Sequence, residues 1–162
     1  MGRGVRGAEG ERAQGPGGNG IVRALIIYSK RGGIEPLAKA IASSLSEHAV
    51  RVDLQEADER TGGPVSAAPY DVICVGSPVL GFWRGEVAAD VDATIKRFTR
   101  LEGRQAAAFV KPAIFGTGKA LRRLMGILER QGAMVQDFAA IRGLAEARAF
   151  SRRLENLIRK KP

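Results

Sequence analysis

The sequence predicts an α/β fold, a three-layer sandwich in which a doubly wound, five-stranded parallel sheet lies between two layers of helices. Apolar runs of buried type alternate with helix-patterned segments along residues 21–162, and this alternation is typical of a parallel sheet covered on both faces. The chain has 162 residues, of which 44 % are hydrophobic, enough for one domain with a substantial core. Five strands in about 140 residues, joined by right-handed crossovers, fit the strand order 2-1-3-4-5.

The first half of the chain supplies two strands and one helix. An uninterrupted apolar run predicts a buried strand at residues 23–28. Apolar residues at spacings of three and four form one face of a predicted helix over residues 34–47. Alternating Val and Leu predict a short strand at residues 51–54. The stretch 56–69 is polar and rich in Gly and Pro, so at most a short or poorly formed helix is expected in it.

The second half repeats the alternation with fewer polar interruptions. A loop at residues 81–86 separates the third strand from its helix. The next helix is expected to begin with Thr117 as its N-cap and to be closed by Gly132 in a left-handed cap. The strands are predicted at residues 70–76, 105–110 and 134–141, and the helices at residues 87–99, 116–131 and 144–159.

The charge of the chain bears on its partners. The net charge is +9, and residues 142–161 carry seven Lys or Arg against two Glu. A basic end of this kind attracts nucleic acid, anionic lipid or an acidic protein. We interpret these basic residues as the solvated face of a helix that ends in a charged tail. Nucleic acid is not expected as a partner, because Phe150 is the only aromatic residue among these charges.

Cysteine content and hydropathy bear on location. Cys74 is the only cysteine, so no intramolecular disulfide can form, and its apolar neighbours predict a core residue. No apolar run approaches the roughly 20 residues that span a bilayer, and no secretory signal is recognised, so we expect a cytoplasmic protein without membrane insertion. Residues 1–20 are rich in Gly with almost no large apolar side chain, which predicts a disordered Gly/Arg-rich tail before the domain at 21–162.

Three loops gather at the carboxyl ends of the strands, where open parallel sheets bind ligands. The first loop follows the strand 23–28 and leads into a helix with Pro36 in its first turn, so its N–H groups and the helix dipole suit a phosphate. The second and third loops supply apolar and aromatic surface and glycines, between which a flat slot for a ring is expected. The candidate binding residues are Ser29, Lys30, Arg31, Gly32, Gly33, Ile34, Ser77, Pro78, Val79, Leu80, Gly81, Phe82, Trp83, Lys111, Pro112, Phe115 and Gly116.

The first loop resembles that of the flavodoxin family. The family loop reads Ser/Thr-x-Thr-Gly-x-Thr and wraps the phosphate of FMN. Here Ser29 and Gly32 match it, whereas Arg31 and Ile34 stand in place of hydroxyl residues. We expect Lys30 or Arg31 to restore part of the attraction for phosphate by a charge-assisted contact.

The likeness covers residues 23–143. The Gly-Ser-Pro turn at residues 76–78 is similar to the second family loop, which borders the isoalloxazine ring, and residues 107–132 are similar to the third loop with its helix. The resemblance implies a flavodoxin-like fold, non-covalent FMN and electron transfer. It also implies a backbone carbonyl beside flavin N5 near Leu80 and Gly81.

The sequence leaves several alternatives open. The glycine turn could merely connect a strand to a helix, and the protein would then be a cofactor-free binding or regulatory module. A dimeric quinone or flavin reductase is a third possibility. Phe82 either stacks at the rim or covers the following helix, and Trp83 is expected to be exposed. If the protein carries electrons, its positive charge favours an acidic redox partner.

Overall fold

The structure is a computed structural model, which describes residues 20–60 and 62–159. The predicted tail at 1–20 lies outside these residues, apart from Gly20. The elements are β1 (Val22–Tyr28), α1 (Ile34–Ser46), β2 (Val50–Glu56), β3 (Val65–Ser66), β4 (Val72–Pro78), α2 (Ala89–Lys96), β5 (Phe98–Thr99), β6 (Gln105–Lys111), α3 (Thr117–Arg130), β7 (Met134–Ala140) and α4 (Leu144–Arg159).

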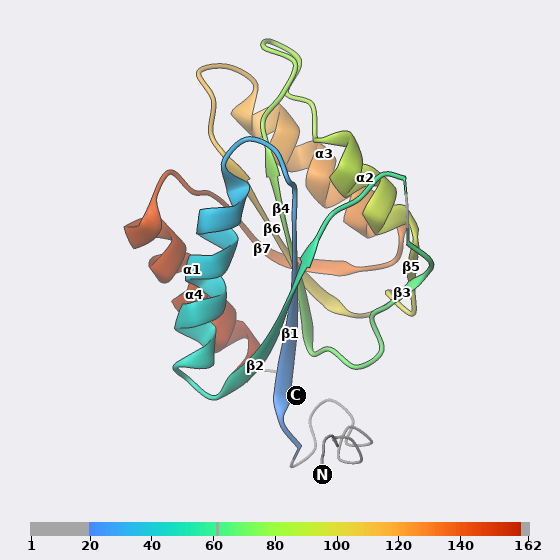
Figure 1. The fold of residues 1–162 in the computed structure, drawn as a ribbon, viewed down its shortest axis with the longest axis vertical. Helices are drawn as coiled ribbons and strands as arrows, with labels where there is room; N and C mark the ends of the chain where they lie inside the picture. Colours follow the sequence, from blue (N-terminus) through green and yellow to red (C-terminus); the bar gives the residue numbers. More distant parts are fainter. Residues whose placement is uncertain (1–19, 61, 160–162) are drawn as a thin grey trace.

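Five of the strands form one parallel sheet in the order β2-β1-β4-β6-β7. Counted along the chain without the two short strands, this order is 2-1-3-4-5, so the predicted topology is confirmed. Helices α1 and α4 cover one face of the sheet, and α2 and α3 cover the other (Figure 1). The predicted three-layer sandwich is therefore present.

The short strands β3 and β5 pair in parallel outside the main sheet, which the sequence did not predict. The N–H of Val65 donates to the Arg97 carbonyl at 3.0 Å, and the N–H of Ala67 donates to the Thr99 carbonyl at 2.9 Å. This pairing ends α2 at Lys96, whereas the helix was predicted to continue to Thr99. The described part of the connection between β2 and β4 contains no helix, so the short helix that the sequence left open is absent from it.

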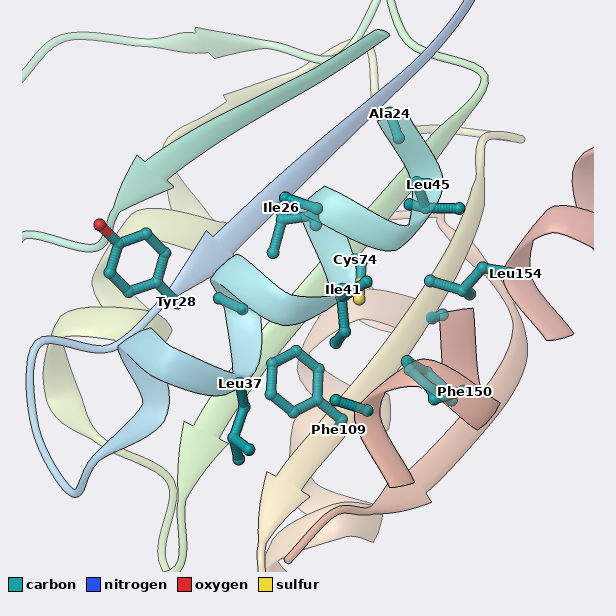
Figure 2. Packing of buried hydrophobic residues seen from close by; sticks show 14 of the residues in the cluster. Ala24, Ile26, Tyr28, Leu37, Ile41, Leu45, Cys74, Phe109, Phe150 and Leu154 are labelled. Carbon is teal, nitrogen blue, oxygen red and sulfur yellow. The ribbon is translucent and has the colours of Figure 1, made fainter. Parts of the chain in front are cut away.

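The sheet separates two hydrophobic cores, because successive side chains of a strand point to opposite faces. Ala24 and Ile26 of β1 join the core under α1 and α4, whereas Leu25 and Ile27 join the core under α2 and α3. Figure 2 shows the first of these cores, in which the rings of Phe109 and Phe150 lie 6.1 Å apart between their centroids.

Cys74 belongs to the first core and is fully buried, as predicted, and its burial raises the pKa of the thiol well above its usual value. Within the described residues, no helix has the length and hydrophobicity needed to cross a membrane. The same residues contain no group of three or more His, Cys, Asp or Glu that could bind a metal ion.

Candidate functional site

Loop one, residues 29–34, joins β1 to α1 at the carboxyl end of the sheet. Gly32 and Gly33 both have left-handed backbone angles, with φ of 70° and 72°, and both are exposed. Gly33 is the N-cap of α1, and no side chain caps the helix there. Because the first N–H groups of a helix have no intrahelical partners, this exposed turn offers backbone donors at the positive end of the α1 dipole.

Loop one lies directly against the end of β4, where loop two (residues 76–83) begins. A Cβ added to Gly32 would lie 2.4 Å from the Cβ of Pro78. Gly32 is therefore required twice, by its positive φ and by this close approach. The contact fixes the turn above the end of β4, where the sequence predicted that the two loops would meet.

Asp90, at the start of α2, fixes the beginning of loop one by hydrogen bonds to its carboxylate. The carboxylate is 5 % exposed. It accepts hydrogen bonds from the Ser29 hydroxyl at 2.9 and 3.0 Å and from the Lys30 N–H at 3.1 Å. The N–H of Arg31 donates to the Ser29 hydroxyl at 3.1 Å. The family-like hydroxyl and two amides of the loop are thus already bonded within the protein.

The remaining side chains of loop one also point elsewhere. The Lys30 ammonium lies 3.7 Å from the carboxylate of Asp58, and the Arg31 guanidinium lies 3.9 Å from Glu59, both beyond the end of β2. Ile34 is fully buried in the core under α1, so only its backbone can face a ligand. The compensation expected from Lys30 or Arg31 therefore finds no support in their ion pairs.

Lys111, the last residue of β6, places a cation over the glycine turn instead. A Cβ added to Gly33 would lie 2.8 Å from Lys111 Nζ. Phe109 points into the core beneath α1, and alternation along the strand directs the side chain two residues later to the same face. The sequence assigned Lys111 to the third loop but not to the first. The signal that could have found this contact is the pairing of β6 beside β4, which aligns Lys111 with Pro78.

Loop two continues into a tight hairpin that rises from the carboxyl end of the sheet beside loop three, residues 111–118 (Figure 1). Leu80 and Glu86 exchange backbone hydrogen bonds of 2.9 and 2.7 Å, and the Arg84 N–H donates to the Gly81 carbonyl at 2.8 Å. Phe82 at the tip has a φ of 49° and is 65 % exposed, and Trp83 is 59 % exposed. The expected exposure of Trp83 is confirmed, and Phe82 lies at the rim rather than over α2.

The aromatic side chains of loops two and three meet at this rim. The Trp83 and Phe115 rings are tilted by 30° with centroids 3.9 Å apart, and Phe82 makes edge contacts with both, at 4.8 and 5.5 Å. The slot expected between the loops is therefore closed by Trp83 against Phe115. A planar ring enters between them only if they separate to about 7 Å, two stacking distances.

Ser77, Val79 and Thr117 have structural roles that the sequence did not reveal. Ser77 is fully buried, and its hydroxyl accepts the Ala88 N–H at 3.0 Å and donates to the Pro78 carbonyl at 2.9 Å. Val79 packs against the core under α2 and α3. Thr117 is not an N-cap, because Gly116 caps α3 with a φ of 82° and no side-chain bond. The Thr117 hydroxyl instead bonds the N–H and carbonyl of Ala113 at 3.1 and 3.0 Å.

These residues fit the two ends of FMN unequally. The glycine turn, the start of α1 and Lys111 together suit the phosphate of a mononucleotide. The exposed aromatic rim supplies flat apolar surface for the isoalloxazine, provided that Trp83 and Phe115 part. A hollow of about 440 Å³ lies at loop three, and it is lined by Lys111, Pro112, Ala113, Ile114 and Arg142.

Comparison with known proteins supports the fold. No protein-family model and no curated protein matches the sequence. Among solved structures, oxidised flavodoxin 2 from Bacillus cereus is 22 % identical with a TM-score of 0.65, over 84 % of this chain and 99 % of that one. A flavodoxin from Streptococcus pneumoniae is 17 % identical with a TM-score of 0.64, over 84 % and 99 %. General stress protein 14 from Treponema denticola, solved with FMN, is 14 % identical with a TM-score of 0.55, over 84 % and 97 %. The protein therefore has the flavodoxin-like fold.

Proposed function

We propose that this protein binds FMN non-covalently and transfers electrons through it. The observation that carries the proposal is the exposed turn at Gly32 and Gly33, where an uncapped helix start meets the ammonium of Lys111. Such a turn binds a phosphate group, and the exposed aromatic rim lies on the neighbouring loops of the same sheet edge. When bound, the flavin supplies the redox chemistry, and the protein holds and shields it.

Each part of the proposed site has a defined role. The amides of the turn and Lys111 hold the phosphate, and Trp83 and Phe115 cover the ring. The Gly81 carbonyl, now bonded to the Arg84 N–H, lies in the hairpin next to the rim. Turning that carbonyl toward the ring breaks one hydrogen bond and changes ψ of Gly81 and φ of Phe82, and the absence of a Cβ on Gly81 leaves the backbone free to do so.

An acidic redox partner is the second part of the proposal. The net charge of +9 favours association with negatively charged proteins. The apolar rim of Phe82, Trp83 and Ile114 would form the centre of the contact, since exposed aromatic residues are enriched at interface centres. This part is tested with FMN-loaded, chemically reduced protein. Oxidation by the ferricyanide anion should slow as salt is added, and oxidation by basic cytochrome c should not.

A cofactor-free binding module is the rival function, and two contacts favour it. Asp90 occupies the Ser29 hydroxyl and the Lys30 amide, and Trp83 lies against Phe115. In that case the aromatic rim would be a docking surface for a protein and no flavin would enter. No contact in the described residues favours the dimeric reductase over these two functions.

The deciding experiment is an FMN titration that follows the fluorescence of both partners. Trp83 is the only tryptophan, so its emission reports on the rim alone. FMN binding should quench Trp83 and the flavin together and saturate at one flavin per chain. The Trp83→Tyr variant keeps an electron-rich ring and should still quench FMN fluorescence. Unchanged emission up to high micromolar FMN would leave the binding module as the function.

A further inference from the structure

The anion-binding capacity of loop one depends on a residue outside it. Ser29 is bonded to Asp90, Lys30 and Arg31 pair with carboxylates beyond β2, and Ile34 lies in the core. None of these side chains is directed to the glycine turn. Lys111 reaches the turn from β6, and no carboxylate of the described residues forms an ion pair with its ammonium.

The balance of charge at the turn makes this lysine decisive. The N-terminus of α1 contributes about +0.5 of an elementary charge through its dipole. The buried Asp90 carboxylate, bonded to the Lys30 amide of the same loop, opposes it with a full negative charge. Asp90 also lies in the first turn of α2, so the dipole of that helix offsets part of its charge. The Lys111 ammonium adds a full positive charge to this small balance, and a phosphate at the turn would bind less tightly without it.

We propose that Lys111 is the phosphate-binding side chain of this protein and makes it selective for a flavin with a phosphate monoester over riboflavin. This inference rests on the proposed function. Lys111 takes the place of hydroxyl donors on loop one, and its contact with phosphate comes from the strand β6. A charge-assisted hydrogen bond of this kind is stronger than a neutral one. The expected consequence is binding that weakens with salt, because exposed charges are screened.

The Lys111→Gln variant tests the proposal against a matched control. Gln removes the charge and keeps a shorter polar side chain, at an exposed position where folding should be unaffected. Lys119→Gln removes an exposed cation at the start of α3 and should leave flavin binding unchanged. Lys111→Arg keeps the charge and should retain most of the affinity.

Two ligands separate a phosphate contact from a general loss of structure. Lys111→Gln should lower the FMN affinity about tenfold and leave riboflavin affinity unchanged, because riboflavin has no phosphate. The salt dependence of FMN binding should become shallower in the same variant. Equal FMN affinity in Lys111→Gln and wild type, or a parallel loss of riboflavin affinity, would overturn the assignment of Lys111 and leave FMN binding standing.

Inorganic phosphate separates this inference from the proposed function. In amide NMR spectra, millimolar phosphate should shift the signals of Gly32 and Gly33 in the wild type but not in Lys111→Gln. If wild type takes up no flavin yet shows these shifts, FMN binding fails and the anion site at Lys111 remains. If neither flavin nor phosphate has an effect, both proposals fail.

Discussion

A charge placed at Gly33 gives the sharpest test of where the phosphate binds. A Cβ at this position meets only the end of the Lys111 side chain, at 2.8 Å from Nζ, and that flexible end can move aside. Gly32 is unsuitable, because a Cβ there would lie 2.4 Å from Pro78 and disrupt the packing of loops one and two. We therefore compare Gly33→Asp with Gly33→Asn, which have the same shape and differ in charge.

Both variants carry the same backbone strain. The φ of Gly33 is 72°, and Asn and Asp are the side chains that tolerate the left-handed region best. Both also displace the Lys111 ammonium, and only the Asp carboxylate can form an ion pair with it. Any difference in FMN affinity between them therefore measures the effect of one negative charge at the turn.

The size of that difference follows from Coulomb's law. Two unit charges about 4 Å apart repel by about 1 kcal/mol in water and by about 4 kcal/mol at a protein surface. A phosphate monoester carries about −1.5 to −2 at neutral pH, so the Asp variant should bind FMN at least about 2 kcal/mol more weakly. This corresponds to about a thirtyfold higher Kd.

The assay is FMN fluorescence quenching at low salt, with thermal unfolding as a check that both variants fold equally well. Gly33→Asn should lose the part of the affinity that depends on the position of Lys111, about tenfold at most. Gly33→Asp should bind FMN about thirtyfold more weakly than Gly33→Asn. Raising the salt concentration should narrow the gap between them. Equal affinities of the Asn and Asp variants would show that no phosphate binds at this turn.

Three further predictions concern the stability of the scaffold. Gly76→Ala puts a Cβ 2.1 Å from the Phe109 ring and should lower the free energy of urea unfolding by about 1–3 kcal/mol; Gly63→Ala, which meets no atom within 4 Å, is the control, and equal values would contradict the packing. Asp90→Ala leaves buried donors without an acceptor and should cost about 2–4 kcal/mol in the same assay; an unchanged midpoint would mean that the carboxylate does not hold loop one. Burial and a hydrogen bond to Asp53 raise the pKa of Tyr70 from 10.0 to about 12. The folded state therefore keeps the phenol proton to a higher pH than the unfolded chain does, and the free energy of unfolding should fall as the pH rises from 10 to 12. The Tyr70→Phe variant should lack this part of the pH dependence.

The local pattern of the sequence was sufficient to predict the main sheet and the helices that cover it. The run at β1 is apolar on both faces because each face meets a separate core, with Ile26 under α1 and Leu25 under α2 and α3. Such runs alternating with helices allow few topologies. The sequence did not predict the pairing of β3 with β5, because a strand of two residues shows no periodicity. Val65 pairs with Phe98 across a long stretch of chain, so the pairing depends on the rest of the fold.

The site was predictable as a place but not as a set of contacts. Parallel strands end at one edge, so the loops had to meet there. The partner of Ser29 is Asp90, 61 residues away, and the cation at Gly33 comes from the far end of β6. Nothing in the spacing of these residues shows which carboxylate or ammonium reaches the turn, because that depends on the register of neighbouring strands.

The closed aromatic rim is a modest obstacle to a flavin. Separating Trp83 from Phe115 gives up one aromatic pair, worth about 0.5–1.5 kcal/mol beyond the buried area, a factor of roughly ten or less in affinity. An inserted isoalloxazine replaces this pair by two stacking contacts. The loop backbones are held by the approach of Gly85 to Gly116, where an added Cβ would lie 2.3 Å from the Gly116 carbonyl oxygen. Entry of the ring therefore requires the side chains to rotate, not the loops to unfold, and the contacts of the phosphate would then decide whether a flavin stays bound.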